Sequence, residues 1–207
     1  MNYEILYAFT LATAALAISP GPDNIYVLTR SLADGKKYGL ATVGGLLSGC
    51  LVHTSLLAFG VSVILRESAM LFMGIKLLGA VYLLYLAFKT YRSDAILEIS
   101  AEKVPTKGLG QLFKQGFIMN VLNPKVTIFF LAFFPGFLFS QTLNTVLQFY
   151  VLGLVFMLVS GLIFSGIAVL SGSISKFLVR NQNTGPILKW MQITVFVGIA
   201  AYLLLSE

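Results

Sequence analysis

The stretch SPGPDN, Ser19 to Asn24, decides the fold. It interrupts an apolar run, with AFTLATAALAI before it and IYVLTRSLA after it. Proline has no backbone N–H and its ring clashes with the preceding helical turn, so Pro20 and Pro22 predict a broken helix. Backbone groups that are freed inside a membrane must find partners or line a cavity. A break that also contains the carboxylate of Asp23 therefore indicates a functional site.

The rest of the chain has the composition of an integral membrane protein. Of its 207 residues, 57% are hydrophobic and 11% are charged, and the mean hydropathy is +0.89. A soluble domain of this size is about 45–50% apolar and about 25% charged. Cys50 is the only cysteine, which excludes an internal disulfide, a CxxC redox pair and a thiol metal cluster. We expect no metal site and no cofactor.

Six membrane spans are expected, because a helix needs about 20 apolar residues to cross a bilayer. The first span starts near Tyr3 and contains the SPGPDN break. The fourth, about Phe113–Phe134, contains a second interruption, NVLNPK. The other four are Tyr38–Leu65, roughly Ala69–Phe88, roughly Val146–Leu170 and about Ile187–Leu205. We therefore predict an all-α integral membrane protein that forms a single transmembrane domain over residues 1–207.

The distribution of basic residues predicts the orientation. If the N-terminus lies outside, the inside loops contain Arg30, Lys36, Lys37, Lys89, Arg92, Lys103, Lys107, Lys114, Lys176, Arg180 and Lys189. The outside segments then contain only Arg66 and Lys76, and Lys76 is expected to extend to the outer surface. Because cytoplasmic loops are enriched in Lys and Arg, both termini are predicted to lie outside. The same distribution explains the net charge of +6 without a nucleic-acid partner.

The first break has a counterpart in the second half of the chain. Pro124-Lys125 lies 102 residues after Pro22-Asp23, and in both a proline precedes a charged residue. The two pairs fall in the first span of two three-span halves, about 1–92 and 108–207, joined by a polar loop at about 91–110. Because three is odd, the halves would cross the membrane in opposite directions, as inverted repeats. Interrupted helices at corresponding positions of inverted repeats mark the substrate site of many transporters.

Each proline is expected to begin a half-helix, with Gly21 before the first and Asn123, a good N-cap residue, before the second. The N-termini of half-helices attract carboxylates. We expect Asp23 and Lys125 to be neighbours across the site, where a substrate with an ammonium and a carboxylate group would replace the partner of each. Asp23 is also the candidate proton carrier, because burial favours the neutral form of a carboxylate. Alternatively, the two charges form a structural pair and the prolines only kink their helices.

Three other polar residues leave two interpretations open. Asn120 and Asn123 lie on one helix face, and they either bind substrate or satisfy the carbonyls that Pro124 frees. His53 lies on an apolar span, and it either forms a hydrogen bond to a neighbouring helix or takes part in proton coupling.

The remaining small and aromatic residues are expected to have packing roles. Gly44, Gly45 and Gly49 in GGLLSG form a face of small residues, which usually means close helix packing and otherwise lines a path. Such glycine faces also favour a homodimer. Tyr82 and Tyr85 are expected to pack inside the protein or to face lipid.

Four motifs, taken together and in this order, resemble the lysine exporter family (LysE/RhtB type) of bacterial amino-acid effluxers. They are SPGPDN, GGLLSG followed by His53, KLLGAVYLLYLAF, and NVLNPKVTIFFLAFFPGF, and the resemblance covers nearly the whole chain. It implies a six-helix exporter of the bacterial inner membrane, driven by proton exchange. It also implies that transport depends on Ser19, Pro20, Gly21, Pro22, Asp23 and Asn24 and on the residues from Asn120 to Lys125. Gly136 and Ala87 depart from the common family pattern, which leaves the substrate branch open.

We therefore predict an efflux carrier for amino acids or close derivatives that works by alternating access. Its substrates would be neutral, of the threonine, homoserine or leucine type, or else basic. A metal-cation carrier is the alternative, although divalent sites usually need more ligands than one intramembrane carboxylate, one histidine and one cysteine. An enzyme is not expected, because no nucleophile–base pair is evident, and a non-transporting protein would not need paired charges at matching breaks. The expected partners are the substrate, protons, the lipid bilayer and a second copy of the chain.

Overall fold

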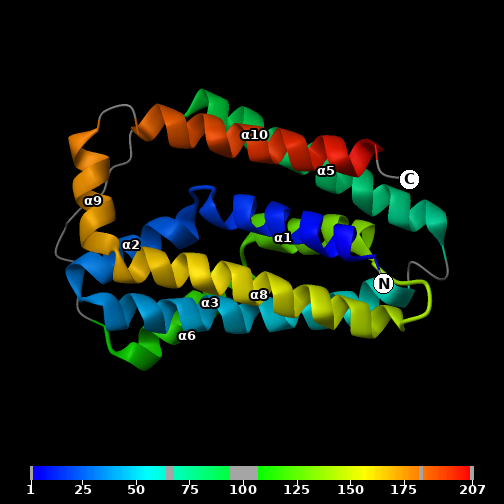
Figure 1. Ribbon diagram of the computed structural model, residues 1–207, viewed down its shortest axis with the longest axis horizontal. Coiled ribbons are helices and arrows are strands. Elements are labelled where there is room, and N and C mark those ends of the chain that lie inside the picture. Colours follow the sequence, from blue (N-terminus) through cyan, green and yellow to red (C-terminus); the bar gives the residue numbers. More distant parts are fainter. Residues whose placement is uncertain (1, 64–67, 94–106, 182–183, 206–207) are drawn as a thin grey trace.

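The computed structural model describes residues 2–63, 68–93, 107–181 and 184–205. Every regular element in these ranges is a helix, so the predicted all-α fold is confirmed for this part of the chain (Figure 1). Most of the predicted polar loop, together with Arg66 and Lys103, lies outside the described residues.

Four stretches of helix are long and apolar enough to cross a membrane by themselves. They are α3 (Lys36–Leu56) with its π-helical continuation η1 (Leu57–Val61), α5 (Ala69–Arg92), α8 (Thr145–Val169) and α10 (Thr184–Leu205). Two further candidate spans are bent pairs, as predicted for the first and fourth. The first pair is α1 (Tyr3–Ile18) with α2 (Pro22–Ala33), bent by 58°. The second runs from α6 (Leu109–Val121) through α7 (Pro124–Ile128) and η2 (Phe129–Phe133) to η3 (Phe134–Phe137), bent by 50°.

The first break forms where its prolines stand. Helix α1 ends at Ile18, and Pro22 occupies the first position of α2, where a missing N–H leaves no helical bond unmade. Across the gap, Nδ2 of Asn24 donates a hydrogen bond of 2.7 Å to the carbonyl of Ala17 in the last turn of α1. The break thus satisfies one of its freed carbonyls with a side chain from its own motif.

The second break satisfies its backbone in a similar way. Asn123 is the N-cap of α7, and its Oδ1 accepts a hydrogen bond from the backbone N–H of Lys125 at 3.1 Å. The carbonyl of Asn120 lies four residues before Pro124, which has no N–H to offer it. That carbonyl instead accepts from the backbone N–H of Asn123 at 3.0 Å and from Nε2 of His53 at 3.2 Å.

Helices α3 and α6 approach each other backbone to backbone. A Cβ atom at Gly45 would overlap the carbonyl of Phe113, and one at Gly116 would overlap the carbonyl of Thr42. A Cβ at Gly49 would lie 2.6 Å from Oδ1 of Asn120. Glycine is therefore required at these crossings, and this close contact holds Asn120 against α3.

The helices form layers along the length of the molecule (Figure 1). Helices α5 and α10 pack against each other in one layer, and α1 and α2 lie between this pair and α3 and α8. The short helix α9 (Ser171–Arg180), which the sequence analysis did not predict, lies across one end of the bundle. Helix α1 begins and α10 ends at the opposite end.

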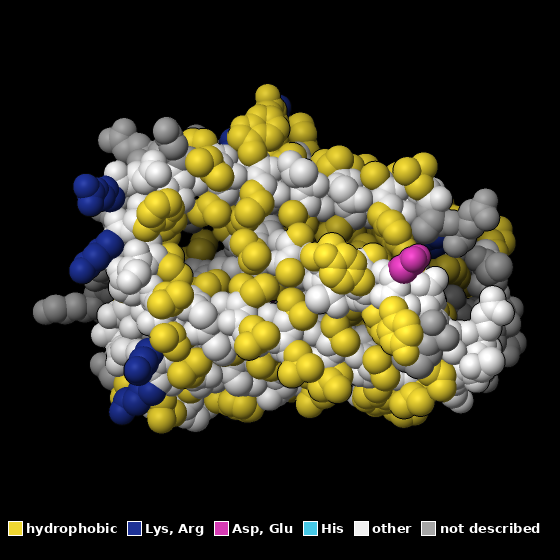
Figure 2. All heavy atoms as spheres, in the orientation of Figure 1, with side chains coloured by type: hydrophobic (Ala, Val, Ile, Leu, Met, Phe, Trp, Pro, Cys, Tyr) yellow, Lys and Arg dark blue, Asp and Glu magenta, His cyan; other side chains and the backbone are white. Residues whose placement is uncertain are grey.

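The surface agrees with a membrane location. Apolar side chains are spread over the sides of the bundle, and Lys and Arg side chains gather at the end where α9 lies (Figure 2). Many large apolar side chains on the long helices are exposed, among them Leu78, Leu162 and Leu205. Such surfaces are stable in lipid and unfavourable in water.

The glycine contact between α3 and α6 yields a matched test of the packing. We expect Gly45→Ala to lower the free energy of unfolding by about 1–3 kcal/mol, because the new methyl group overlaps the backbone of Phe113. In Gly198→Ala the methyl group enters open space on α10, so stability is unchanged or rises by roughly 0.5–1 kcal/mol. Thermal unfolding of the purified protein in detergent measures both, and equal effects would contradict the assigned contact.

Candidate functional site

A small cavity lies behind the two breaks, between α1, α2, α3, α6 and α8. Its volume of about 30 Å³ exceeds the roughly 10–15 Å³ that a cavity needs to hold one water molecule. The predicted site residues that line it are Gly21, Pro22, Asp23, Asn24, Asn120, Asn123 and Lys125. Residues from both breaks therefore meet at one place, although they are about a hundred positions apart in the chain.

Asp23 joins the first break to the second. Its Oδ2 accepts a hydrogen bond of 3.0 Å from Nδ2 of Asn123, and the residue is 7% exposed. Its other oxygen, Oδ1, is buried with no hydrogen-bond partner among the described residues. The same is true of Oγ of Ser160, which lines the small cavity from α8. Since buried polar atoms rarely stay unpaired, these two oxygens are candidate acceptors for a polar group that enters the small cavity.

Lys125 approaches the first break from the second. Its Nζ lies 5.2 Å from the centre of the Phe196 ring on α10, and a Cβ atom at Gly21 would lie 3.6 Å from it. Asp23 and Lys125 line the same small cavity, but no ion pair joins them in the described structure. The two side chains are thus close to each other, but they do not neutralise each other by direct contact.

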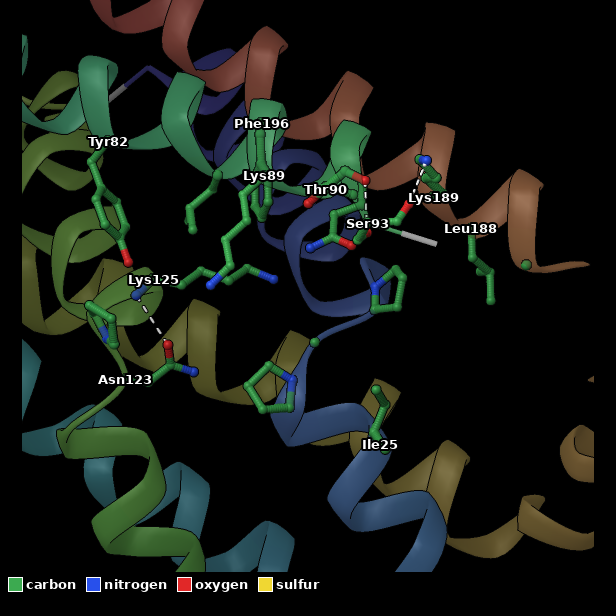
Figure 3. A pocket seen from close by; sticks show the side chains of 17 residues that line it. Ile25, Tyr82, Lys89, Thr90, Ser93, Asn123, Lys125, Leu188, Lys189 and Phe196 are labelled. Atoms are coloured by element: carbon green, nitrogen blue, oxygen red, sulfur yellow. Dashed lines mark hydrogen bonds between the residues drawn. The ribbon is translucent and has the colours of Figure 1, made fainter. Parts of the chain in front are cut away.

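A larger cavity of about 600 Å³ lies on the other side of the breaks (Figure 3). It separates the breaks from α5 and α10 and reaches the last turn of α5 and the first turn of α10, at the α9 end of the bundle. Asn123 and Lys125 line both cavities, together with Gly21 and Pro22. These residues form the wall between the two spaces, and Pro20 and Pro124 extend that wall on the side of the larger cavity.

Some of the predicted site residues line neither cavity. His53 is hydrogen-bonded to the carbonyl of Asn120, and its ring centre lies 5.4 Å from that of Phe130, with the two planes tilted by 39°. Oγ of Ser19 is buried with no hydrogen-bond partner among the described residues. Gly45 and Gly49 face α6, and a Cβ atom at Gly44 would lie 3.4 Å from the Phe113 ring. The glycine face that favoured a homodimer is therefore occupied within the chain.

The sequence analysis assigned other roles to two residues, and the structure corrects them. Tyr82 was expected to pack or to face lipid, yet it lines the larger cavity, whereas Tyr85 is 54% exposed. Lys76 was expected to extend to the outer surface, yet it is buried, with its Nζ 5.7 Å from the centre of the Phe72 ring. Both errors have one cause, since the rotation of an apolar helix about its axis depends on its neighbours.

Several residues that contribute to the cavities were not predicted as site residues. They are Tyr82, Lys89, Ser160, Lys189, Gln192 and Phe196. One sequence signal could have found two of them, because Tyr82 and Lys89 are seven residues apart and therefore share a helix face. Ser160 is a single hydroxyl in an uncharged helix, and no spacing distinguishes it from a packing residue.

The sequence of this chain matches a known protein family. Residues 14–207 match the LysE type translocator family. The chain belongs to this family. The predicted resemblance to the lysine exporter family is thereby confirmed, and the protein is a multi-pass membrane translocator.

Two relatives of this translocator have names that state a function. The homoserine/homoserine lactone efflux proteins of Salmonella typhimurium and Salmonella typhi are each 29% identical to it over 178 residues. That alignment covers 86% of this chain and 85% of each relative. An uncharacterized membrane protein of Vibrio cholerae is 26% identical over 183 residues, or 88% of either chain. No solved structure matches.

The hydrogen bond between Asp23 and Asn123 yields a second prediction. In Asn123→Asp the cap on α7 is retained, but a second carboxylate replaces the amide donor that faces Asp23. We expect a loss of about 1.5–3 kcal/mol in the free energy of unfolding at neutral pH. Because two carboxylates in contact bind a proton more readily in the folded state than in the unfolded state, stability should rise as the pH falls.

Two controls accompany this variant. Asn144→Asp makes the same change at the N-cap of α8, which is exposed and faces no carboxylate in the described structure, so stability should not fall. The exchange Asp23→Asn with Asn123→Asp restores a donor and an acceptor and should recover most of the loss. Thermal unfolding in detergent between pH 5 and pH 8 measures all three, and a loss that the exchange leaves unrepaired would contradict the assigned bond.

Proposed function

We propose that this translocator exports amino acids or close derivatives of them across the bacterial inner membrane in exchange for protons. Two relatives named for homoserine/homoserine lactone efflux support a substrate of the amino-acid type. One observation carries the proposal. Opposite charges, Asp23 and Lys125, lie at the wall between the two cavities without an ion pair between them.

A zwitterionic amino acid supplies what this wall lacks. Its ammonium group would fit in the small cavity and would donate to the unpaired Oδ1 of Asp23 and Oγ of Ser160. Its carboxylate would lie beside the ammonium group of Lys125, where charge-assisted hydrogen bonds are strongest. The larger cavity leaves room for the side chain and lies within the usual range of ligand pockets.

The contacts of α5 and α10 support alternating access. At the end away from α9 these helices contact the rest of the bundle: Tyr202 donates a hydrogen bond of 3.0 Å to the carbonyl of Gly136, and its ring stacks at 4.9 Å on Phe137. Near α9 the same two helices are separated from the breaks by the larger cavity. A path that is closed at one end and open at the other is what a carrier presents in one of its two states.

The orientation and the repeat are part of the same proposal. Because Lys and Arg gather at the α9 end, that end is assigned to the cytoplasm and both termini to the outside. The chain halves would be inverted repeats. In support, α6 of the second half packs on α3 of the first, and α1 of the first half packs on α8 of the second. In both contacts the first span of one half packs on the second span of the other half. This arrangement is consistent with two halves related by a two-fold axis in the membrane plane.

Asp23 would couple the substrate to the proton. A proton and a substrate ammonium group compete for the same carboxylate, so binding of one excludes the other. Outward movement of the loaded carrier and return of the protonated carrier would then exchange amino acid for proton. His53, which is bonded to Asn120 at the second break, is the second candidate for proton coupling.

Uptake into proteoliposomes tests this function. Labelled neutral and basic amino acids are offered with and without an imposed pH gradient, to the wild type and to Asp23→Asn. We expect one class of amino acid to accumulate in response to the gradient. The rate of this gradient-driven uptake should be at least about tenfold lower in the variant than in the wild type, a difference of about 1.4 kcal/mol. Glu4→Gln removes an exposed carboxylate that lines neither of these cavities and should behave like the wild type.

The outcomes separate the parts of the proposal. No accumulation of any amino acid by the folded wild type would overturn the amino-acid assignment. Equal responses of the wild type and Asp23→Asn would leave an amino-acid carrier and refute the role of Asp23 in proton coupling.

A further inference from the structure

The larger cavity has an unusual charge distribution. Three lysines from three helices line it: Lys89 from α5, Lys125 from α7 and Lys189 from α10. Among the described residues that line it there is no Asp and no Glu. Asp23 lines only the small cavity behind the wall.

The lysines differ in how they are held. Lys125 lies at the wall, beside the Phe196 ring. Lys189 is half-buried, and its Nζ donates a hydrogen bond of 2.7 Å to the backbone carbonyl of Ser93 at the end of α5. Lys89 is exposed and points from α5 into the space in front of Asn123 and Lys125 (Figure 3). No hydrogen bond or ion pair joins the side chain of Lys89 to another described residue.

These positions define a route for a substrate that enters from the α9 end. It first passes Lys189 and Lys89, then reaches Lys125, and only then Asp23. Clefts lined by charges of one sign concentrate their field, because the protein walls have a low dielectric constant. A carboxylate is attracted along the whole of this route. A second cationic group on the substrate is repelled along it, and the described lining residues offer no carboxylate to receive that group.

We propose that Lys89 and Lys189 determine the charge specificity of the carrier: they favour substrates that have a carboxylate and a net charge of zero or below, and they select against dibasic amino acids and against derivatives whose carboxylate is masked. This inference rests on the proposed amino-acid function and deepens it. It selects the neutral alternative over the basic one, and it separates free acids from lactones and esters.

A series of compounds on one carbon skeleton tests the proposal. Aspartate, homoserine, 2,4-diaminobutyrate and homoserine lactone share four carbons and differ in charge and in the presence of a free carboxylate. Each competes with the exchange of whichever labelled amino acid the wild type transports best, in phosphatidylcholine vesicles. We expect aspartate and homoserine to inhibit at concentrations at least about tenfold lower than diaminobutyrate and the lactone.

The variants assign this preference to the two lysines. Lys89→Gln with Lys189→Gln should reduce the ratio between the diaminobutyrate and aspartate inhibition constants at least about fivefold. Lys89→Gln alone removes no side-chain hydrogen bond or ion pair to another described residue, and it should reduce this ratio by a smaller factor. This single variant still tests the proposal if the double variant does not fold. Lys36→Gln with Lys114→Gln removes the same charge from exposed positions that do not line the cavity, and it should leave the ratio unchanged.

Each result has one meaning. Transport of no amino acid by the wild type would refute the proposed function itself. Transport without a charge order, or with an order that the double variant retains, would refute this inference and leave the function standing. The inference also fails if the Lys36 and Lys114 control lowers the ratio equally. It fails as well if the cavity variants change only the response to added phosphatidylglycerol, since the lysines would then bind lipid headgroups.

Discussion

The structure depends on one constraint: inside a membrane, a backbone group that a broken helix frees cannot be left to water. Both breaks meet this constraint with side chains from nearby. Asn24 pairs with the Ala17 carbonyl, Asn123 caps α7, and His53 reaches the Asn120 carbonyl from α3. These polar side chains pair with backbone groups that the breaks free, whereas Oδ1 of the neighbouring Asp23 has no hydrogen-bond partner among the described residues.

The bond between Asp23 and Asn123 turns two separate breaks into one wall. Because Asn123 also caps α7, a single side chain fixes the start of one half-helix and its position relative to the other. Asp23 lines only the small cavity, Lys89 and Lys189 line only the larger one, and Lys125 lines both. A zwitterion that spans the wall would meet opposite charges at its two ends, which is the physical basis of the proposed transport site.

Much of this arrangement could be predicted from residues that are unfavourable in their surroundings. A proline in an apolar helix must break it, and a charged residue in a span must face a cavity or a partner, so both breaks and the residues Asp23, Asn120, Asn123 and Lys125 stand out in the sequence. Tyr82, Ser160 and Phe196 do not stand out in the sequence, because residues of these types are tolerated both on lipid-facing surfaces and in a protein interior. Helix α9 was missed because its ten residues are too few to register as a span.

The sequence by itself determined where the long apolar helices run and where two of them are interrupted, because hydropathy and proline act locally along the chain. It also determined that charged residues sit at both stops. Only the tertiary structure decided that the stops touch, that Asp23 and Lys125 share a cavity without an ion pair, and that Lys89 and Lys189 line its approach. The physical reason is that the rotation of each helix is set by contacts between helices, such as Gly45 on Phe113, and apolar helices carry no polar face that would reveal it.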